Sequence, residues 1–302
     1  MIPKQVIIET CSRCNLSCEG CYRDLGEVSN TVMDLDLFKK IVDQMTDQTA
    51  CLASHGEVML DPTFVEKLRY LGEKGIRCDF TTNGTIFKDE FFQALQDYPR
   101  ELHRVVVSLD GLYADTREAK RHLGKLIDYP IDFINRLIGM KNSGLLPDDF
   151  DVTVSLMRSD QDYAEIEHFI RHWLMAGADM VLIRTKLDAT PQKEATYKSG
   201  CRYRTQIVSV DANGMMRLCD RYMPGSNTFI ADMRTEPLLE TFAKIPEQAV
   251  CKTCSQAYTG SGIHGEVFFK NNGFKCFYSK DYYHEIYSKK DKRSGLSWGI
   301  RE

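Results

Sequence analysis

The chain has 302 residues, of which 43% are hydrophobic and 27% charged, values typical of a globular protein rather than a disordered or fibrous one. Its 39 lysines and arginines stand against 43 aspartates and glutamates, so the basic excess common in nucleic-acid-binding proteins is missing. No apolar run approaches about 18 residues, and the start, MIPKQVIIET, has no signal-peptide core. We therefore expect a cytoplasmic protein that binds neither a membrane nor nucleic acid.

Short β-branched runs alternate with helical periodicity up to about residue 187. The predicted strands are residues 6–10, 51–54, 78–82, 104–109, 152–157 and 180–184. Apolar residues recur at helical spacing around 37–45, 64–71, 134–138 and 166–173. We expect Asp34 or Asp36 to open the first of these helices, and Asp61 with Pro62 to be the N-cap and first residue of the second.

This alternation predicts an α/β fold with right-handed βαβ units and a parallel sheet. Six units are too few for a closed eight-stranded barrel, so we expect an open, partial (β/α)6 TIM-like barrel. Sites in such sheets form at the carboxyl ends of the strands.

The pattern changes after residue 187. Runs at 206–210 and 215–218 flank Asn213 and Gly214, a strong signal for a β-hairpin, and a helix is expected near 236–244. We predict a barrel domain over 1–187, a small second module over 188–255, and a tail of unassigned role over 256–302.

The chain has 11 cysteines, which gather near its two ends. Clustered cysteines in a cytosolic protein are more often metal ligands or catalytic groups than disulfides. Cys14, Cys18 and Cys21 follow the first predicted strand at spacing C-x3-C-x2-C. Three thiolates suit three corners of a [4Fe–4S] cube and leave one iron open. The alternative, a zinc site that adds Cys11, is disfavoured because three residues between the pairs are far fewer than usual.

Residues 13–22, RCNLSCEGCY, resemble the signature of the radical S-adenosylmethionine (SAM) superfamily. Three further segments support the resemblance. SHGEV at 54–58 is similar to the family's G-G-E-P motif, TTNG at 81–84 ends the third predicted strand as in many members, and VSLDG at 107–111 resembles the strand that bears a SAM-binding serine. The departures are His55 for glycine, Val58 for proline and Cys11 for the usual asparagine or threonine.

The resemblance implies that the open iron binds SAM, and that an electron from the reduced cluster cleaves SAM to methionine and a 5′-deoxyadenosyl radical. That radical then takes a hydrogen atom from a C–H bond of the substrate. Six residues are the implied SAM contacts: Tyr22, Gly56, Glu57, Asn83, Ser108 and Arg121, with Lys120 as the alternative in register for Arg121.

The second cluster holds Cys201 and Cys219, at the two ends of the predicted hairpin, and the pair Cys251 and Cys254. These four can converge on one site, for which structural zinc competes with iron–sulfur chemistry. The segment resembles the SPASM/twitch extension of radical SAM enzymes. In its shorter twitch form the resemblance implies one auxiliary [4Fe–4S] cluster, which makes two clusters in the chain.

Other candidates lie outside these motifs. Cys276 has three possible roles: a buried residue, a further ligand of the second metal site, or a thiol that donates a hydrogen atom to a substrate radical. Arg184 closes the sixth predicted strand and is a candidate to hold a substrate hydroxyl or carboxylate, against the alternative of a structural salt bridge. Lys186 and Asp188 are weaker candidates of the same kind. Cys51 and Cys78 are expected in the core, and His168 and His172 on a solvated helix face.

The resemblance leads to two reactions on a small polar substrate of the sugar, aminocyclitol or aminoglycoside class. One is dehydrogenation through the auxiliary cluster; the other is epimerisation with a cysteine as hydrogen donor. Modification of a ribosomally made peptide is the alternative, and a zinc-stabilised binding module is the non-enzymatic one. The enzyme would also need an electron donor such as flavodoxin or ferredoxin.

Overall fold

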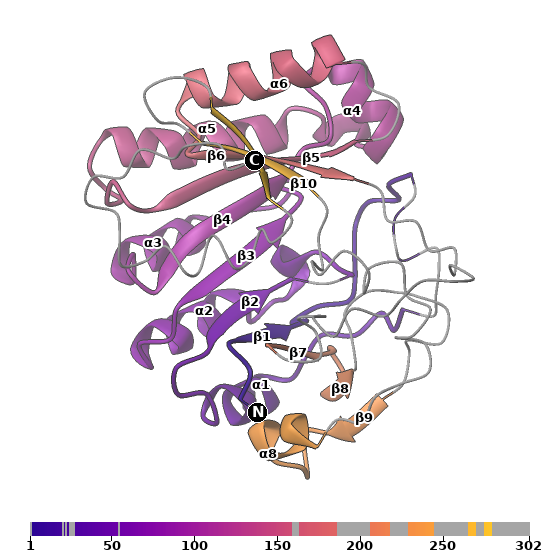
Figure 1. The fold of residues 1–302 in the computed structure, drawn as a ribbon, viewed down its shortest axis with the longest axis vertical. Helices are drawn as coiled ribbons and strands as arrows, with labels where there is room; N and C mark the ends of the chain where they lie inside the picture. Colours follow the sequence, from indigo (N-terminus) through magenta and orange to yellow (C-terminus); the bar gives the residue numbers. More distant parts are fainter. Residues whose placement is uncertain are drawn as a thin grey trace.

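The computed structural model describes residues 2–19, 21, 23, 28–53, 55–158, 163–185, 206–217 and 229–244, and the backbone of 265–269 and 275–279. Within these residues lies one curved sheet with strand order β11-β10-β6-β5-β4-β3-β2-β1-β7-β8-β9 (Figure 1). The first six strands are parallel and stand in chain order. Their bounds are β1 Gln5–Ile8, β2 Thr49–Leu52, β3 Cys78–Thr82, β4 Leu102–Ser108, β5 Asp151–Arg158 and β6 Met180–Thr185. The prediction of a partial, open barrel of six βα units is confirmed.

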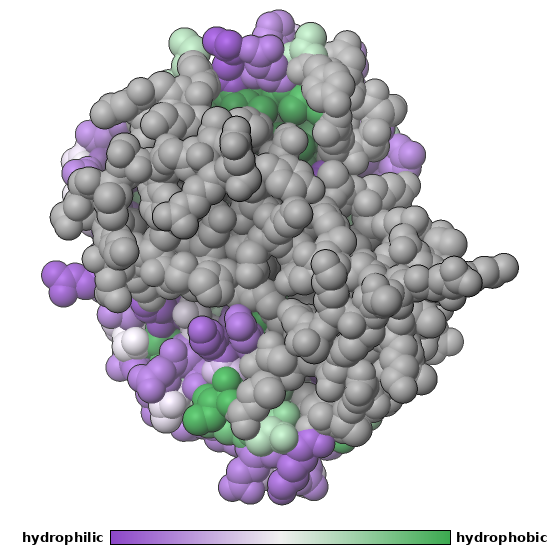
Figure 2. All heavy atoms as spheres, in the orientation of Figure 1, coloured by the Kyte–Doolittle hydropathy of each residue, from purple (hydrophilic) through white to green (hydrophobic). Residues whose placement is uncertain are grey.

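Helices follow the strands and lie along the outer side of the curved sheet (Figure 1). They are α1 Leu35–Val42, α2 Phe64–Glu73, α3 Asp89–Asp97, α4 Ala114–Arg121, α5 Tyr129–Asn142 and α6 Tyr163–Ala176, with short 3₁₀ turns η2 Val58–Leu60 and η3 Gly124–Leu126. In α6 the buried residues Ile166, Phe169 and Trp173 alternate with exposed polar ones. Figure 2 shows hydrophilic atoms at the upper rim, where this helix lies, with hydrophobic atoms beneath them.

Side chains alternate between the two faces of each strand, and this alternation separates the core from the barrel interior. Val105 and Val107 of β4, like Val181 and Ile183 of β6, pack into one large core with the helices. The residues between them face the inside of the barrel. There a second, smaller apolar cluster forms from Ile7, Cys51 and Ile207. Cys51 and Cys78 are buried, as expected.

The region after residue 205 does not stand apart from the barrel sheet. Strand β7 (Ile207–Val210) pairs in parallel with β1, and the predicted hairpin joins it to β8 (Met215–Arg217), with Gly214 at φ +79° in the turn. β9 (Phe229–Asp232) and α8 (Leu238–Ala243) follow. From the predicted tail, β10 (Gly265–Phe269) pairs antiparallel with β6, and β11 (Lys275–Ser279) with β10. The domain boundaries themselves stay a prediction.

Helix α1 begins as expected, because the Asp34 carboxylate accepts hydrogen bonds from the backbone of Asp36 and Leu37. The predicted N-cap of α2 was wrong by two residues. Thr63 is its N-cap, and Asp61 instead accepts hydrogen bonds from the Thr63 backbone and hydroxyl. The second carboxylate oxygen of Asp61 is engaged by a buried lysine, which holds Asp61 in the preceding turn.

His103 of β4 is buried as a neutral group. Burial, together with the positive charges of Arg104 and Arg77, lowers the pKa of His103 to about 3. Because the unfolded chain takes up this proton near the ordinary pKa of about 6.5, acid favours unfolding as the pH falls below that value. We expect the wild type to lose about 2 kcal/mol more unfolding free energy between pH 7 and pH 5 than His103→Gln, measured by urea denaturation. Parallel pH curves for the two proteins would contradict this.

No helix within the described residues is both long enough and apolar enough to cross a membrane.

Candidate functional site

The three cysteines at C-x3-C-x2-C lie on the loop that follows β1, and Cys14, Cys18 and Cys21 are all partly buried. A turn closes the last pair, since the backbone N–H of Cys21 donates to the carbonyl of Cys18 at 3.2 Å. Two arginines hold the start and end of the loop. Arg13 donates to the carbonyl of Asn30 at 3.0 Å, and Arg23 donates to the carbonyls of Ser12 and His55.

The environment of two of these thiols, Cys14 and Cys18, disfavours the free thiolate. Burial raises the pKa of Cys14 and raises the pKa of Cys18 to about 11, although the charge of Arg121 opposes the shift at Cys18. A cationic metal centre deprotonates the thiols that bind it. Metal binding would therefore favour the thiolate forms of Cys14 and Cys18. No group of three His, Cys, Asp or Glu side chains in the described residues surrounds a single metal ion. A cube-shaped cluster differs in that each thiolate binds its own iron.

The loop after β2 packs directly on the cysteine loop. A Cβ on Gly56 would lie 2.1 Å from the carbonyl oxygen of Cys11 and 2.7 Å from that of Arg13, so only glycine allows this approach. The backbone N–H of Glu57 donates to the same Arg13 carbonyl at 2.7 Å. The G-G-E-P-like segment is thus fastened to the backbone that leads into the three cysteines.

The carboxylate of Glu57 is occupied by the protein itself. It accepts hydrogen bonds from the Thr82 hydroxyl and the Asn83 backbone, both at 2.6 Å, and from the Met59 backbone at 3.1 Å. Burial raises the pKa of Glu57, although these donors and the charge of Arg121 oppose the shift. Only 2% of Glu57 is exposed. The carboxylate is thus engaged within the protein, and the contact of Glu57 with SAM stays a prediction.

The end of β3 reaches the cysteine loop through side-chain amides. Asn83 donates to Asn15 at 3.0 Å, and Asn15 donates to the Thr85 hydroxyl at 2.9 Å. Asn83 also accepts from the backbone and hydroxyl of Thr85. Asn83 is thereby fixed next to Asn15, between Cys14 and Cys18.

Beyond β4, an ion pair joins Asp110 to Arg121 at 2.6 Å. The other Asp110 oxygen accepts from the Met157 backbone at 2.7 Å. Arg121 is 5% exposed, and its Nε is buried without a hydrogen-bond partner among the described residues. Such a donor is suited to an anionic ligand, as the SAM carboxylate is. Ser108, at the end of β4, is partly exposed and lies 3.4 Å from the Ser155 hydroxyl.

Backbone strain marks both sides of this ion pair. Among the described non-glycine residues, Asp110 and His122 have positive φ, at 60° and 52°. The left-handed conformation raises the free energy of a non-glycine residue by about 1 kcal/mol, and residues that adopt it are often found at functional sites. The adjacent Lys120 accepts a hydrogen bond from the Glu19 backbone at 2.9 Å and pairs with the Glu19 carboxylate at 3.7 Å. Arg121 and Lys120 were the two alternatives for the SAM-binding cation. Arg121 is the buried one, paired with Asp110, while Lys120 binds Glu19 of the cysteine loop.

A family model described as the radical SAM superfamily matches residues 8–144, which include the cysteine loop, the Gly56 loop, the end of β3 and the Asp110–Arg121 pair. The chain contains a radical SAM domain. Such domains bind a [4Fe–4S] cluster and SAM, and they place the chain among enzymes. Both cofactors fit the residues present: three partly buried thiols, a glycine that allows close backbone approach, and a buried guanidinium whose Nε has no hydrogen-bond partner within the described part of the chain.

Two curated relatives extend the match. The chain is 27% identical over 195 residues to the tungsten-containing aldehyde ferredoxin oxidoreductase cofactor-modifying protein of Pyrococcus furiosus, over 63% of this chain and 53% of that protein. It is 28% identical over 122 residues to the subtilosin biosynthesis protein AlbA of Bacillus subtilis, over 40% and 27% of the two chains. The chain thus spans about half the length of these relatives or less.

The fold is also that of a solved structure, Streptococcus suis SuiB bound to precursor peptide SuiA. The TM-score is 0.66, the identity is 14%, and the match covers 84% of this chain and 70% of that one.

The radical SAM domain has two buried residues that sequence reasoning did not select. Glu9, directly after β1, accepts hydrogen bonds from the backbone and ring of His55, at 3.0 and 3.1 Å, and from the backbone of Ala212 at 3.2 Å. Burial acts to raise the pKa of Glu9, but the bonds and charge of His55 outweigh it and lower that pKa. The Glu9 carboxylate thus joins the end of β1 to His55 in the loop after β2 and to the β7–β8 turn. In the sequence, the one signal for this contact was His55, which stands where the family motif has glycine.

Several predicted site residues fall outside the described residues: Tyr22, Cys201, Cys219, Cys251, Cys254, Lys186 and Asp188. Their roles stay predictions. Cys276 is on β11, where its backbone is in register with Phe268 of β10. Arg184 is the fifth residue of β6, and His168 and His172 are exposed on α6, as expected.

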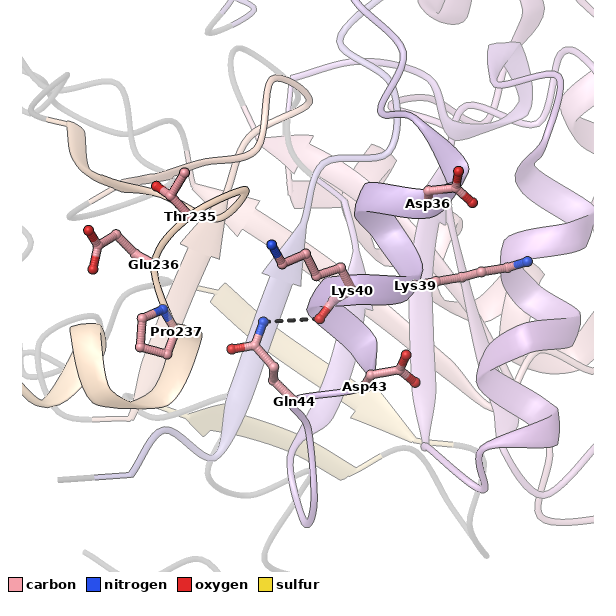
Figure 3. A pocket seen from close by; sticks show the side chains of 8 residues that line it. All are labelled: Asp36, Lys39, Lys40, Asp43, Gln44, Thr235, Glu236 and Pro237. Carbon is pink, nitrogen blue, oxygen red and sulfur yellow. Dashed lines mark hydrogen bonds between the residues drawn. The ribbon is translucent and has the colours of Figure 1, made fainter.

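A hollow of about 560 Å³ lies elsewhere, between α1 and the segment that leads into α8 (Figure 3). Most of its lining residues are polar or charged, with Lys39 and Lys40 of α1 and the C-cap Asp43 opposite Thr235 and Glu236. None of the predicted site residues lines it. Two hydrogen bonds connect its two sides: Lys40 donates to the Arg234 carbonyl, and the Leu238 backbone donates to Gln44.

Proposed function

We propose that this chain cleaves SAM reductively and uses the resulting radical to remove a hydrogen atom from a C–H bond of a polar organic substrate. The bound cluster and SAM together supply the electron transfer and the 5′-deoxyadenosyl radical. The observation that carries the proposal is the convergence of three partly buried thiols, the Gly56 loop and the Asp110–Arg121 pair at the carboxyl ends of β1, β2 and β4.

The protein residues in this proposal bind and orient. Cys14, Cys18 and Cys21 hold three irons as thiolates, and the fourth iron stays open to SAM. The backbone of residues 56–57 receives the SAM amino group, Arg121 receives its carboxylate, and Ser108 and Asn83 complete the pocket. Asp110 keeps Arg121 in place with both of its own oxygens engaged. Fixing the reactants in this way is the main catalytic contribution open to the protein.

We further propose a second [4Fe–4S] cluster on Cys201, Cys219, Cys251 and Cys254. The hairpin between the first two cysteines is built onto β1, the strand that leads to the first cluster. With an auxiliary cluster near the substrate, the reaction is dehydrogenation of a sugar, aminocyclitol or aminoglycoside; with a thiol donor such as Cys276 it is epimerisation. An electron donor such as flavodoxin or ferredoxin supplies the first electron.

Modification of a ribosomally made peptide is the second candidate. It is favoured by the match to AlbA, a protein named for biosynthesis of the bacteriocin subtilosin.

Replacing Cys14, Cys18 and Cys21 together by alanine tests the proposal. For wild type reconstituted without oxygen we expect about eight irons per chain, falling to about four in the triple variant, with SAM cleavage lost. Iron and sulfide analysis, EPR spectroscopy and 5′-deoxyadenosine formation measure this. Cys51→Ala, which removes a buried cysteine inside β2, should keep all of the iron. Cleavage that survives in the triple variant would contradict the site. Four irons in wild type and none in the variant, with zinc bound, would contradict the second cluster.

A further inference from the structure

Arg184 stands on the inner face of the barrel, near its mouth. Its neighbours Val181 and Ile183 pack into the outer core, so the alternation of β6 turns Arg184 to the other face. It is in register with Met157 of β5 and, on the antiparallel side, with the backbone of Gly265 in β10.

Arg184 differs from the buried arginines in having no carboxylate partner among the described residues. Four arginines are buried, and each pairs with a carboxylate: Arg104 with Asp151, Arg117 with Asp128, Arg121 with Asp110 and Arg217 with Asp211. Arg184 is partly buried, and its Nε is fully shielded from solvent without a hydrogen-bond partner among the described residues. A half-buried guanidinium without a counter-ion is costly, and a bound anion would remove that cost.

The surroundings of Arg184 indicate the charge and chemical type of that anion. On the same inner face, the side chains nearest in register are those of Met157, Ser155 and Ser108, which are all neutral. Asp110, which accepts from the Met157 backbone, is already paired with Arg121. Among the described residues Arg184 therefore adds one positive charge without a counter-ion, which matches one negative charge, and the planar guanidinium suits a carboxylate bound through both oxygens.

Arg184 lies near Ser108, a predicted SAM contact, on the same face of the sheet. Ser108 is two strands away, which at the ordinary spacing between strands is about 10 Å. A molecule held at Arg184 would therefore lie beside SAM rather than replace it.

We propose that Arg184 binds a carboxylate group of the substrate and so directs a neighbouring C–H bond toward SAM. The inference rests on the proposed function and narrows its substrate to a carboxylate-bearing molecule, either an acidic peptide or a sugar acid. It disfavours aminocyclitols and aminoglycosides, because their amino groups are cationic near neutral pH and they carry no carboxylate.

Selective modification of arginine by phenylglyoxal, read by peptide mass spectrometry on SAM-bound holoenzyme, tests the proposal. Arg184 should react at a rate near that of the exposed Arg100, while the paired Arg104 and Arg217 react far more slowly. The probes are acetyl-Gly-Glu-Gly-amide and glucuronate, each beside its neutral amide counterpart. We expect one of the two carboxylates to slow the modification of Arg184 about tenfold and to leave Arg100 unchanged.

Protection by the peptide identifies a peptide substrate, and protection by glucuronate a sugar acid. The inference is overturned if neither protects, if the amides protect equally, or if Arg184 is as unreactive as Arg104. SAM binding is measured on the same preparation by equilibrium dialysis. Failure to bind SAM contradicts the proposed function, whereas SAM binding without protection contradicts only the role of Arg184.

Discussion

Gly56→Ala is expected to abolish SAM binding and to lower the free energy of unfolding by about 3 kcal/mol. The added methyl group would lie 2.1 Å from the Cys11 carbonyl oxygen and 2.7 Å from that of Arg13. Both obstacles are backbone, so no side chain can move aside, and the loop after β2 must separate from the cysteine loop. Urea denaturation and equilibrium dialysis with labelled SAM measure the two effects.

Gly139→Ala is the matched control for this change. Gly139 is exposed in α5, and no heavy atom lies within 4 Å of an added Cβ. Because alanine favours a helix over glycine by about 1 kcal/mol, this variant should be slightly stabilised and should bind SAM normally. Normal SAM binding by Gly56→Ala would show that the two loops are not locked together as described.

The second large effect is expected at Lys67, a fully buried lysine in α2. Its ammonium group contacts the Asp61 carboxylate at 2.6 Å and the Met33 carbonyl at 2.5 Å. Burial lowers the pKa of Lys67, although the bond and charge of Asp61 oppose the shift. Lys67→Met leaves Asp61 buried without its counter-ion, and breaking such a pair from one side costs about 3–5 kcal/mol. Urea denaturation should show this loss.

The double variant Asp61→Asn/Lys67→Met separates the charge from the packing. Removing both charges should recover a large part of the lost stability, because the cost of the single variant comes from an unpaired carboxylate. Lys74→Met breaks an ion pair with Asp43 that is close to half exposed on both sides, and it should change little. Equal losses in the Lys67 and Lys74 variants would contradict the account.

Local sequence was sufficient for the elements whose signals are short-range. The strands β3 and β6, the Asp34 cap and the turn at Gly214 were all predictable, because each depends on periodicity, capping or a backbone conformation within a few residues. Even here Asp61 was misplaced, since its partner Lys67 lies six residues away on α2.

The candidate site divides in the same way. The cysteine spacing and the motif around Gly56 are contiguous in the chain, so the sequence by itself determined the class of chemistry and the loops that carry it. It also predicted a parallel sheet with its sites at the carboxyl ends of the strands.

Only the tertiary structure decided which of these residues have partners. Glu9 meets Ala212 across more than two hundred residues, and Asp110 meets both Arg121 and Met157 from three different elements. Arg184 alone could not be distinguished from a structural arginine until its surroundings were known. The physical reason is that charge pairing and burial are properties of the space around a side chain, and elements distant in sequence fill that space.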